Sequence, residues 1–141
     1  MRNSRFTVLA ILVLTAFLVI GSAAQARRDN QPPRFAGLES AVTCIPGPIG
    51  GDRTTSYHLR WRPARDNVTP RYAIVYDIYQ ATTPGGEDFS KPTYTTHRGY
   101  TSFDTPPLPI NQTFYFVVRA RDLAGNRDSN TVEREGVNLC V

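Results

Sequence analysis

Residues that bind metals or carry redox chemistry are scarce in this chain. Its 141 residues include only two cysteines and two histidines, and no Cys-x-x-Cys motif occurs. His58 and His97 have neither the spacing nor the neighbours of a zinc site. No glycine-rich loop follows a strand and opens a helix, as phosphate binding requires. No nucleophile with a base and no paired carboxylates of a cleft can be recognised, so we predict no metal, no cofactor and no catalytic activity.

A strong excess of positive charge is also missing. The chain has 16 basic and 12 acidic residues and a formal net charge of +4. Two of the basic residues, Arg2 and Arg5, lie in the expected export segment, which leaves 14 basic against 12 acidic residues and a net charge of +2 for the rest. So small a charge gives no electrostatic basis for binding nucleic acid, and we predict that the protein does not bind it.

The longest apolar run lies at the amino terminus. It extends from Phe6 to Ile20, follows Arg2 and Arg5, and leads into small residues with an Ala-x-Ala end at Ala26. This pattern is typical of a secretory signal peptide, and the run is shorter than the roughly 20 residues that a membrane-spanning helix needs. We predict a signal peptide at residues 1–26 and a secreted or cell-envelope protein. If the segment is not cleaved, it would instead anchor the protein to the membrane.

Export changes the interpretation of the two cysteines. Thiols in an oxidising compartment tend to pair, so Cys44 and Cys140 are predicted to form one structural disulfide. The chain-entropy model gives roughly 4 to 5 kcal/mol for closing a loop of about 100 residues. That contribution is large beside the about 5 to 15 kcal/mol that stabilises a typical domain.

Apolar and polar residues alternate in several short segments of the remaining chain. The clearest are residues 57–62, 74–79 and 114–121, and the period of two predicts strands with one buried face. Weaker strands are expected within residues 35–44, 89–96, 101–103 and 131–137, and Pro92 restricts the second of these to a sheet edge. After Ala26, no apolar residues recur at helical spacing over three turns. Six or seven short strands separated by turns predict an antiparallel β-sandwich.

Several of these segments together resemble a bacterial fibronectin type III domain. They are PRFAGL at residues 33–38, the strand with Leu59 and Trp61, IVYDIY at 74–79, and Leu108 and Pro109 leading into FYFVVRARD at 114–122. The resemblance covers residues 34–141, preceded by a short exposed leader at 27–33. It implies an all-β fold, an immunoglobulin-like sandwich of seven antiparallel strands. It also implies that Trp61 lies between the sheets, and the core anchors are then Trp61, Tyr76, Phe114 and Phe116.

The outer face of the second sheet is the candidate binding surface. If the strands 74–79 and 114–121 are neighbours, four side chains lie together on this face: Val75, Tyr79, Tyr115 and Val117. Aromatic and β-branched residues that are exposed together often mark sites of contact with proteins or sugars. On the same face, Asp77 is expected to pair with Arg119.

Two turns rich in aspartate and asparagine leave calcium as an alternative to the prediction of no metal. In the resembled fold, the loop with Asp66 and Asn67 lies at the same end as the loop with Asp122, Asn126 and Asp128. Oxygen ligands from both loops could surround a hard cation. The same residue types are also what tight turns require, which explains them without a metal. Asp29 is placed apart from both loops, in the exposed leader.

The sequence as a whole predicts a secreted, monomeric, non-catalytic binding or adhesion module. It would present a β-sandwich surface, including the turn-rich end, to an unknown extracellular protein or polysaccharide. Two alternatives stay open. One is a carbohydrate-binding accessory to a separate secreted hydrolase, and the other is a structural spacer tethered at the cell surface.

Overall fold

The computed structural model of the chain describes residues 29–44 and 53–139. The predicted signal peptide, the first two residues of the leader and Cys140 lie outside these ranges. The strands in chain order are β1 (Leu38–Thr43), β2 (Thr54–Thr55), β3 (His58–Trp61), β4 (Val75–Ala81), β5 (Tyr94–Thr95), β6 (Ser102–Asp104), β7 (Leu108–Pro109), β8 (Tyr115–Arg121), β9 (Glu133–Glu135) and β10 (Val137–Asn138). A 3₁₀ turn, η1 (Arg71–Ala73), precedes β4. None of the described segments is a helix long and apolar enough to cross a membrane.

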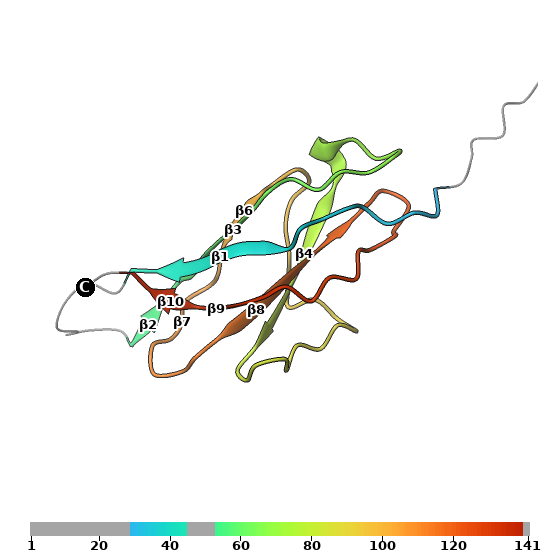
Figure 1. The fold of residues 1–141 in the computed structure, drawn as a ribbon. Helices are drawn as coiled ribbons and strands as arrows, with labels where there is room; N and C mark the ends of the chain where they lie inside the picture. The colour runs from blue at the N-terminus through green and yellow to red at the C-terminus, as the bar shows by residue number, and fades with distance from the viewer. Residues whose placement is uncertain (1–28, 45–52, 140–141) are drawn as a thin grey trace, which may run out of the picture.

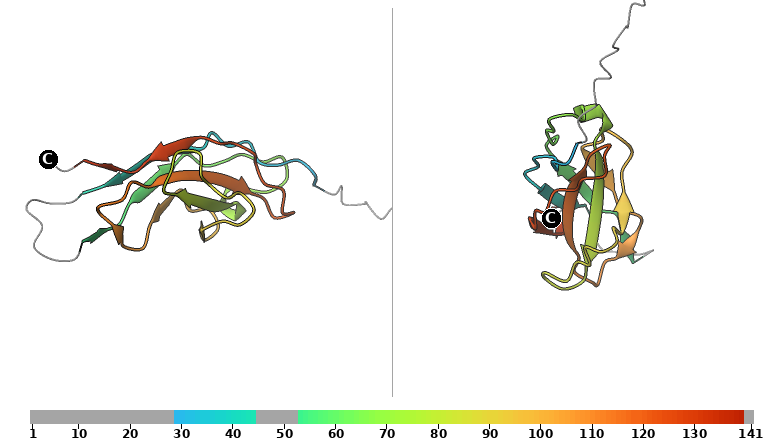
Figure 2. Two further views of the ribbon diagram at one scale, coloured as in Figure 1. Left: turned by 90° about the horizontal axis from the view of Figure 1, so that it is seen from below. Right: turned by 90° about the vertical axis from the view of Figure 1, so that its right-hand side faces the viewer.

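The strands form two four-stranded sheets and one two-stranded ribbon (Figure 1). The first sheet has the order β10-β1-β3-β6, the second has the order β5-β4-β8-β9, and β2 pairs with β7. All these pairs are antiparallel except β1 and β10, which run parallel. The two larger sheets form two layers, as Figure 2 shows, with the apolar cluster between them. The architecture is mostly β and compatible with a β-sandwich.

The predicted count of seven strands is not confirmed, because the described residues form ten. The short β2–β7 ribbon is separate from the main sheets, and the closing strand divides at Gly136 into β9 and β10, which belong to different sheets. At this crossing the chain passes against the core. A Cβ atom added to Gly136 would lie 2.4 Å from Cε1 of Tyr57, so only glycine fits without movement of that ring.

The strand predicted over residues 74–79 spans Val75–Ala81, and the turn η1 lies directly before it. Pro70 is extended, and its carbonyl accepts a hydrogen bond from the Ala73 N–H at 2.9 Å, which closes the turn η1. The weak segment with Pro92 contributes only the two residues of β5, at the edge of the second sheet. Proline is expected at such an edge because it cannot donate a ladder hydrogen bond.

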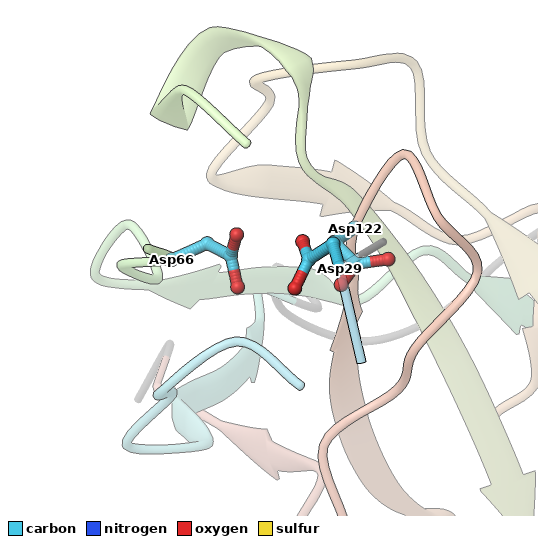
Figure 3. Close-up of side chains that lie close together, drawn as sticks. All are labelled: Asp29, Asp66 and Asp122. Atoms are coloured by element: carbon cyan, nitrogen blue, oxygen red, sulfur yellow. The ribbon is translucent and has the colours of Figure 1, made fainter. Parts of the chain in front are cut away.

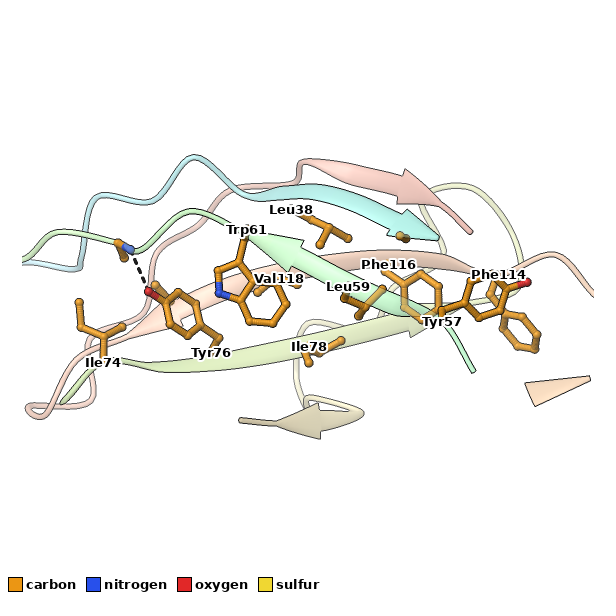
Figure 4. Close-up of a cluster of buried hydrophobic side chains, with 13 residues drawn as sticks. Leu38, Tyr57, Leu59, Trp61, Ile74, Tyr76, Ile78, Phe114, Phe116 and Val118 are labelled. Carbon is orange, nitrogen blue, oxygen red and sulfur yellow. Dashed lines mark hydrogen bonds between the residues drawn. The ribbon is translucent and has the colours of Figure 1, made fainter. Parts of the chain in front are cut away.

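Aromatic side chains from opposite sheets fill the core (Figure 4). Trp61 on β3 packs against Tyr76 on β4 with their ring centroids 5.3 Å apart. Tyr76 also accepts a hydrogen bond at its hydroxyl from the Ala64 N–H at 2.8 Å, drawn as a dashed line in Figure 4. The buried cluster includes all four residues named as core anchors, which are Trp61, Tyr76, Phe114 and Phe116.

The first and last described strands lie side by side. In the parallel pair of β1 and β10, Thr43 is opposite Asn138, and the Leu139 N–H donates to the Thr43 carbonyl at 3.0 Å. Cys44 is the exposed residue that follows β1. Because Cys140 is outside the described residues, the disulfide between the two cysteines stays a prediction.

Candidate functional site

The face predicted as the binding surface is largely covered. Tyr79 and Val117 are each only 1% exposed, and Val75 and Tyr115 are half-buried. The loop from β4 to β5 brings the ring of Phe89 to 5.1 Å from the ring of Tyr79. The prediction that these four side chains form an open surface is therefore wrong for Tyr79 and Val117. Strand periodicity shows which side of a sheet faces away from the core, but not whether a loop folds over that side.

Arg119 completes this cover. Its guanidinium lies 3.6 Å from the centroid of the Phe89 ring and 5.7 Å from that of Tyr79. A guanidinium at these distances is attracted by the negative face of an aromatic ring. The Arg119 Nε also donates to the Asn130 carbonyl at 2.9 Å, which fixes the arginine along the sheet.

Asp77 lies on the same face and is fully buried, but its partners are not the predicted one. Arg119 is opposite Asp77 in the strand register, whereas the ion pairs are made with Arg121 and Arg127, each with Nε 2.8 Å from Asp77 Oδ2. The Thr95 hydroxyl donates to Asp77 Oδ1 at 2.9 Å. Burial alone would raise the pKa of Asp77, but hydrogen bonds from Arg121 and Thr95 and the charges of both arginines hold it below its ordinary value. These contacts give Asp77 a structural role, because the paired carboxylate stabilises the fold.

Exposed apolar side chains gather instead at one end of the molecule. Large hydrophobic residues that are exposed there are Val68 (62%), Tyr72 (77%), Tyr100 (58%) and Leu123 (55%). They lie on residues 62–74, 96–101 and 122–130, three segments that we call the loop end. Val137 and Leu139 are the other two exposed residues of this kind in the described ranges, and they lie at the opposite end, where β10 pairs with the carboxyl end of β1.

Hydrogen bonds between the segments hold the loop end together. The Leu123 N–H donates to the Thr69 hydroxyl at 3.2 Å, and the Gly99 N–H donates to the Ile74 carbonyl at 2.8 Å. Gly99 has a φ of +76°, and a Cβ atom there would lie 2.9 Å from the Tyr72 carbonyl oxygen. The glycine therefore lets residues 97–101 pass directly against the turn that carries Tyr72.

The aspartates of the loop end shape their own turns. Asp66 Oδ2 accepts hydrogen bonds from the N–H groups of Val68 and Thr69 at 2.9 and 2.7 Å. Asp122 accepts the Asn126 N–H on Oδ1 at 2.8 Å and the Asn126 side-chain amide on Oδ2 at 2.7 Å. These are the local bonds that the sequence predicts for aspartate in tight turns.

Asp128, also at the loop end, differs from Asp66 and Asp122 in that it accepts a hydrogen bond from a strand. Its Oδ2 accepts a hydrogen bond from the Ala120 N–H on β8, and burial raises its pKa despite hydrogen bonds from Asn130.

Three carboxylates meet at the loop end, and one of them comes from the leader. One oxygen each of Asp29, Asp66 and Asp122 lies within 4.8 Å of the other two (Figure 3). The sequence predicted that the loops of Asp66 and Asp122 share one end, but it placed Asp29 in an exposed leader. In the structure Asp29 is half-buried, and its carbonyl accepts a hydrogen bond from the Asn126 side chain at 3.3 Å. We call these three residues the acidic cluster.

A backbone pairing far apart in sequence positions the leader. Arg34 and Arg65 exchange two backbone hydrogen bonds, of 2.7 and 3.0 Å, so the chain before Arg34 runs back over the loop of Asp66. A pocket of about 270 Å³ opens between the leader and this loop, lined by Gln31, Pro32, Arg34, Arg65, Asp66 and Asn67. No local sequence signal indicates this pairing.

The two histidines occupy separate surroundings. His58 Nδ1 lies 2.6 Å from Asp104 Oδ1 on neighbouring strands of the first sheet, and both side chains are well exposed. The ring of His97 packs against that of Tyr100 at 5.8 Å, beside a shallow pocket of about 380 Å³.

Comparison of the chain with protein-family models, with curated proteins and with solved structures finds no match. Within the described residues, the loop end with its acidic cluster has the clearest features of a site.

Proposed function

We propose that this chain is an exported, non-catalytic recognition module that binds an extracellular protein through its loop end. The observation that carries the proposal is the gathering of Val68, Tyr72, Tyr100 and Leu123 on loops that adjoin one another. Exposed apolar side chains that lie together mark interaction sites, whereas single ones need no explanation. Tyrosine also supplies a large contact area at a low cost in conformational entropy.

We also propose that the module is a fibronectin type III-like domain. Leaving out the β2–β7 ribbon and counting β9 and β10 as one strand that crosses between the sheets gives seven strands. The buried Trp61 and the division of β3 and β8 between opposite sheets support this assignment. In this fold the loops at one end vary without disturbing the sheets, which suits a binding role.

The proposal includes export and a single disulfide. The parallel pairing of Thr43 with Asn138 supports a link between Cys44 and Cys140, because each cysteine lies within two residues of that pair along the chain. Mass spectrometry of the secreted protein should find the chain starting at Arg27 and both thiols resistant to alkylation without reduction. Free thiols would contradict this part of the proposal.

A protein partner fits the loop end better than a polysaccharide. Val68 and Leu123 are aliphatic and offer neither a flat ring nor a hydrogen bond to a sugar, yet they are more than half exposed. Sugar hydroxyls require polar partners, while the centres of protein interfaces are enriched in apolar and aromatic groups. The carbohydrate-binding accessory and the tethered spacer are the alternatives, and the binding test distinguishes them from a protein-binding module.

The test uses the fluorescently labelled secreted protein on intact cells of the source organism. We expect saturable binding that disappears when the cells are treated with protease, and at least about tenfold weaker binding by the double variant Tyr72→Ser/Leu123→Ser. The matched control is Val137→Ser/Leu139→Ser, which removes exposed apolar groups at the opposite end and should bind like the natural protein.

Three results would overturn the proposal. Equal binding by both double variants would show that the loop end is not the site. Binding that survives protease but is lost after treatment with glycoside hydrolases, together with binding to a glycan array, would favour the accessory to a hydrolase. Absence of binding, with the amino-terminal segment retained in the mature protein, would favour the tethered spacer.

A further inference from the structure

Four arginines line one pocket at the side of the loop end, which we call the arginine pocket. It has a volume of about 310 Å³, and the residues that line it are Arg34, Ala36, Arg62, Pro63, Arg65 and Arg71. No acidic residue is among them, and all four arginines are exposed. Three of the arginines belong to residues 62–74 of the loop end, so the pocket shares a segment with the exposed Val68 and Tyr72.

The backbone already holds these arginines in place. Arg34 and Arg65 are opposite each other in an antiparallel bridge, with both backbone hydrogen bonds formed. Residues opposite each other in such a pair direct their side chains to the same face. Between Arg62 and Arg65, the Ala64 N–H donates to the buried Tyr76 hydroxyl at 2.8 Å and joins this segment to the core. A site with a fixed backbone loses less conformational entropy when a ligand binds.

Most of the positive charge of the arginine pocket has no partner. Among the residues that the structure describes, none forms an ion pair with Arg34, Arg65 or Arg71. Like charges directly opposite in a β pair repel, so the bridge holds Arg34 and Arg65 together at a cost. Asp66 follows Arg65 but lines the neighbouring pocket, and its Oδ2 accepts two N–H groups of its own turn. An anion bound between the arginines would offset their repulsion.

The fourth arginine indicates what kind of anion fits. Arg62 Nε lies 2.7 Å from Glu39 Oε1, so one carboxylate of this chain already pairs with an arginine of the pocket. The two side chains are 83% and 47% exposed, and an ion pair this exposed contributes little to stability. A guanidinium can also form two parallel hydrogen bonds with a carboxylate. Carboxylates are therefore the ligands that suit the other three arginines.

We propose that the arginine pocket binds an acidic segment of the protein partner, with two or more carboxylates facing Arg34, Arg65 and Arg71. This inference rests on the proposed function and adds the chemistry of the partner to it. Tyr72, which is 77% exposed, directly follows Arg71, so apolar and charged contacts would lie side by side. Protein interfaces combine an apolar centre with a polar rim, and arginine and tyrosine are enriched among the residues that carry the binding energy. Complementary charge also speeds the encounter and helps to select the partner.

The first test measures binding of a short, fluorescently labelled polyglutamate peptide to the purified secreted protein. We expect binding at about 50 mM salt that weakens at least about fivefold at about 300 mM, because salt screens exposed charges. A polylysine peptide of the same length should not bind. Dextran sulfate is the comparison for sulfate esters, and it should compete with the labelled peptide no better than unlabelled polyglutamate of the same total charge.

The decisive variant is Arg34→Gln/Arg65→Gln, which keeps both backbone hydrogen bonds and removes two charges from the pocket. It should bind the polyglutamate peptide at least about tenfold more weakly. It should also melt at or above the temperature of the natural protein, because like-charge repulsion is reduced. The matched control, Arg53→Gln/Arg60→Gln, removes two exposed arginines that neither line the pocket nor form an ion pair. The control should lose at most about twofold in affinity, the effect of a lower net charge alone.

The same variants are then compared in the cell-binding test. Added salt and Arg34→Gln/Arg65→Gln should each weaken binding to the cells, whereas Arg53→Gln/Arg60→Gln should bind like the natural protein. Failure of the natural protein to bind cells contradicts the proposed function. Cell binding that Arg34→Gln/Arg65→Gln retains in full contradicts only this inference and leaves the proposed function standing.

Two results on the purified protein would also overturn the inference. Equal peptide binding by the pocket variant and its control would show that net charge alone attracts the peptide. Stronger competition by dextran sulfate than by polyglutamate would assign the pocket to a sulfated polysaccharide. Should Arg34→Gln/Arg65→Gln fail to fold, Arg71→Gln serves in its place, because it leaves the bridge between Arg34 and Arg65 untouched. It should weaken peptide binding at least about threefold, and unchanged binding would contradict the inference equally.

Discussion

The second sheet and the loop end differ in which side chains they bury and in whether their carboxylates have positively charged partners. On the sheet, the charged Asp77 is buried and paired with two arginines, and Tyr79, which was predicted to be exposed, lies under a loop. At the loop end, carboxylates are gathered without counter-charges, and apolar side chains are left in solvent. The first arrangement is what stability favours. The second is unfavourable for the isolated chain, and it is the arrangement expected where something else binds.

The largest expected effect is the loss of the carboxylate on the second sheet. Asp77→Ala leaves Arg121 and Arg127 without their shared partner, and removal of one member of a buried pair costs about 3 to 5 kcal/mol. Urea denaturation measures the change in the free energy of unfolding. Asp104→Ala, which removes an exposed partner of His58, should change stability far less, and equal losses would contradict the contrast between buried and exposed pairs.

Acid should act on the same group. Because the pKa of Asp77 is lower in the folded protein than its ordinary value, the ionised carboxylate stabilises the fold above the unfolded-state pKa of about 3.9. That contribution is lost as the pH falls through the folded-state pKa. Denaturation between pH 2 and pH 6 should therefore show a steep loss of stability below about pH 4, and the loss should be reduced in Asp77→Ala.

A smaller effect is expected from opening the loop that covers the sheet. Phe89→Ala removes the ring between Tyr79 and Arg119, and we expect a loss of about 1 to 2 kcal/mol in the free energy of unfolding. The Tyr79 side chain should become accessible to chemical modification. A variant as stable as the natural protein, with Tyr79 still protected, would show that the cover does not depend on Phe89.

The smallest effect on stability is expected at the loop end. Tyr72→Ser replaces a side chain that is 77% exposed, so the free energy of unfolding should change by less than about 0.5 kcal/mol. Thermal unfolding alongside Phe89→Ala tests the comparison directly. A loss at Tyr72 as large as that at Phe89 would mean that the loop end is part of the folded core and not a free surface.

The strands, the core residues and the aspartate-rich turns could be predicted, because each depends on neighbouring residues in the sequence. The alternation around Leu59, Ile78 and Phe116 reflects a physical period of two, so the strands and the core residues could be identified. Turn chemistry likewise identified the loops of Asp66 and Asp122. The ends of the strands were less predictable, because Pro70 and Gly136 act through turns and close contacts that the period does not reveal.

The parts of the candidate site that could not be predicted depend on contacts between distant segments. The cover of Tyr79 requires knowing where residues 82–93 return to the sheet. The position of Asp29 in the acidic cluster depends on the pairing of Arg34 with Arg65, and no sequence motif predicts that pairing. The partner of Asp77 was also missed, since the side chains of Arg121 and Arg127 reach it from positions other than the one directly opposite.

The crossing at Gly136 has a consequence for the order of folding. Residues 133–138 contribute to both sheets, and β10 must find β1, which lies about a hundred positions earlier in the chain. Such distant pairing closes slowly, on the scale of milliseconds to seconds. The pairing of β1 with β10 can therefore form only after residues up to 138 have been synthesised, so the edge of the first sheet is completed later than the aromatic core between the layers can begin to pack.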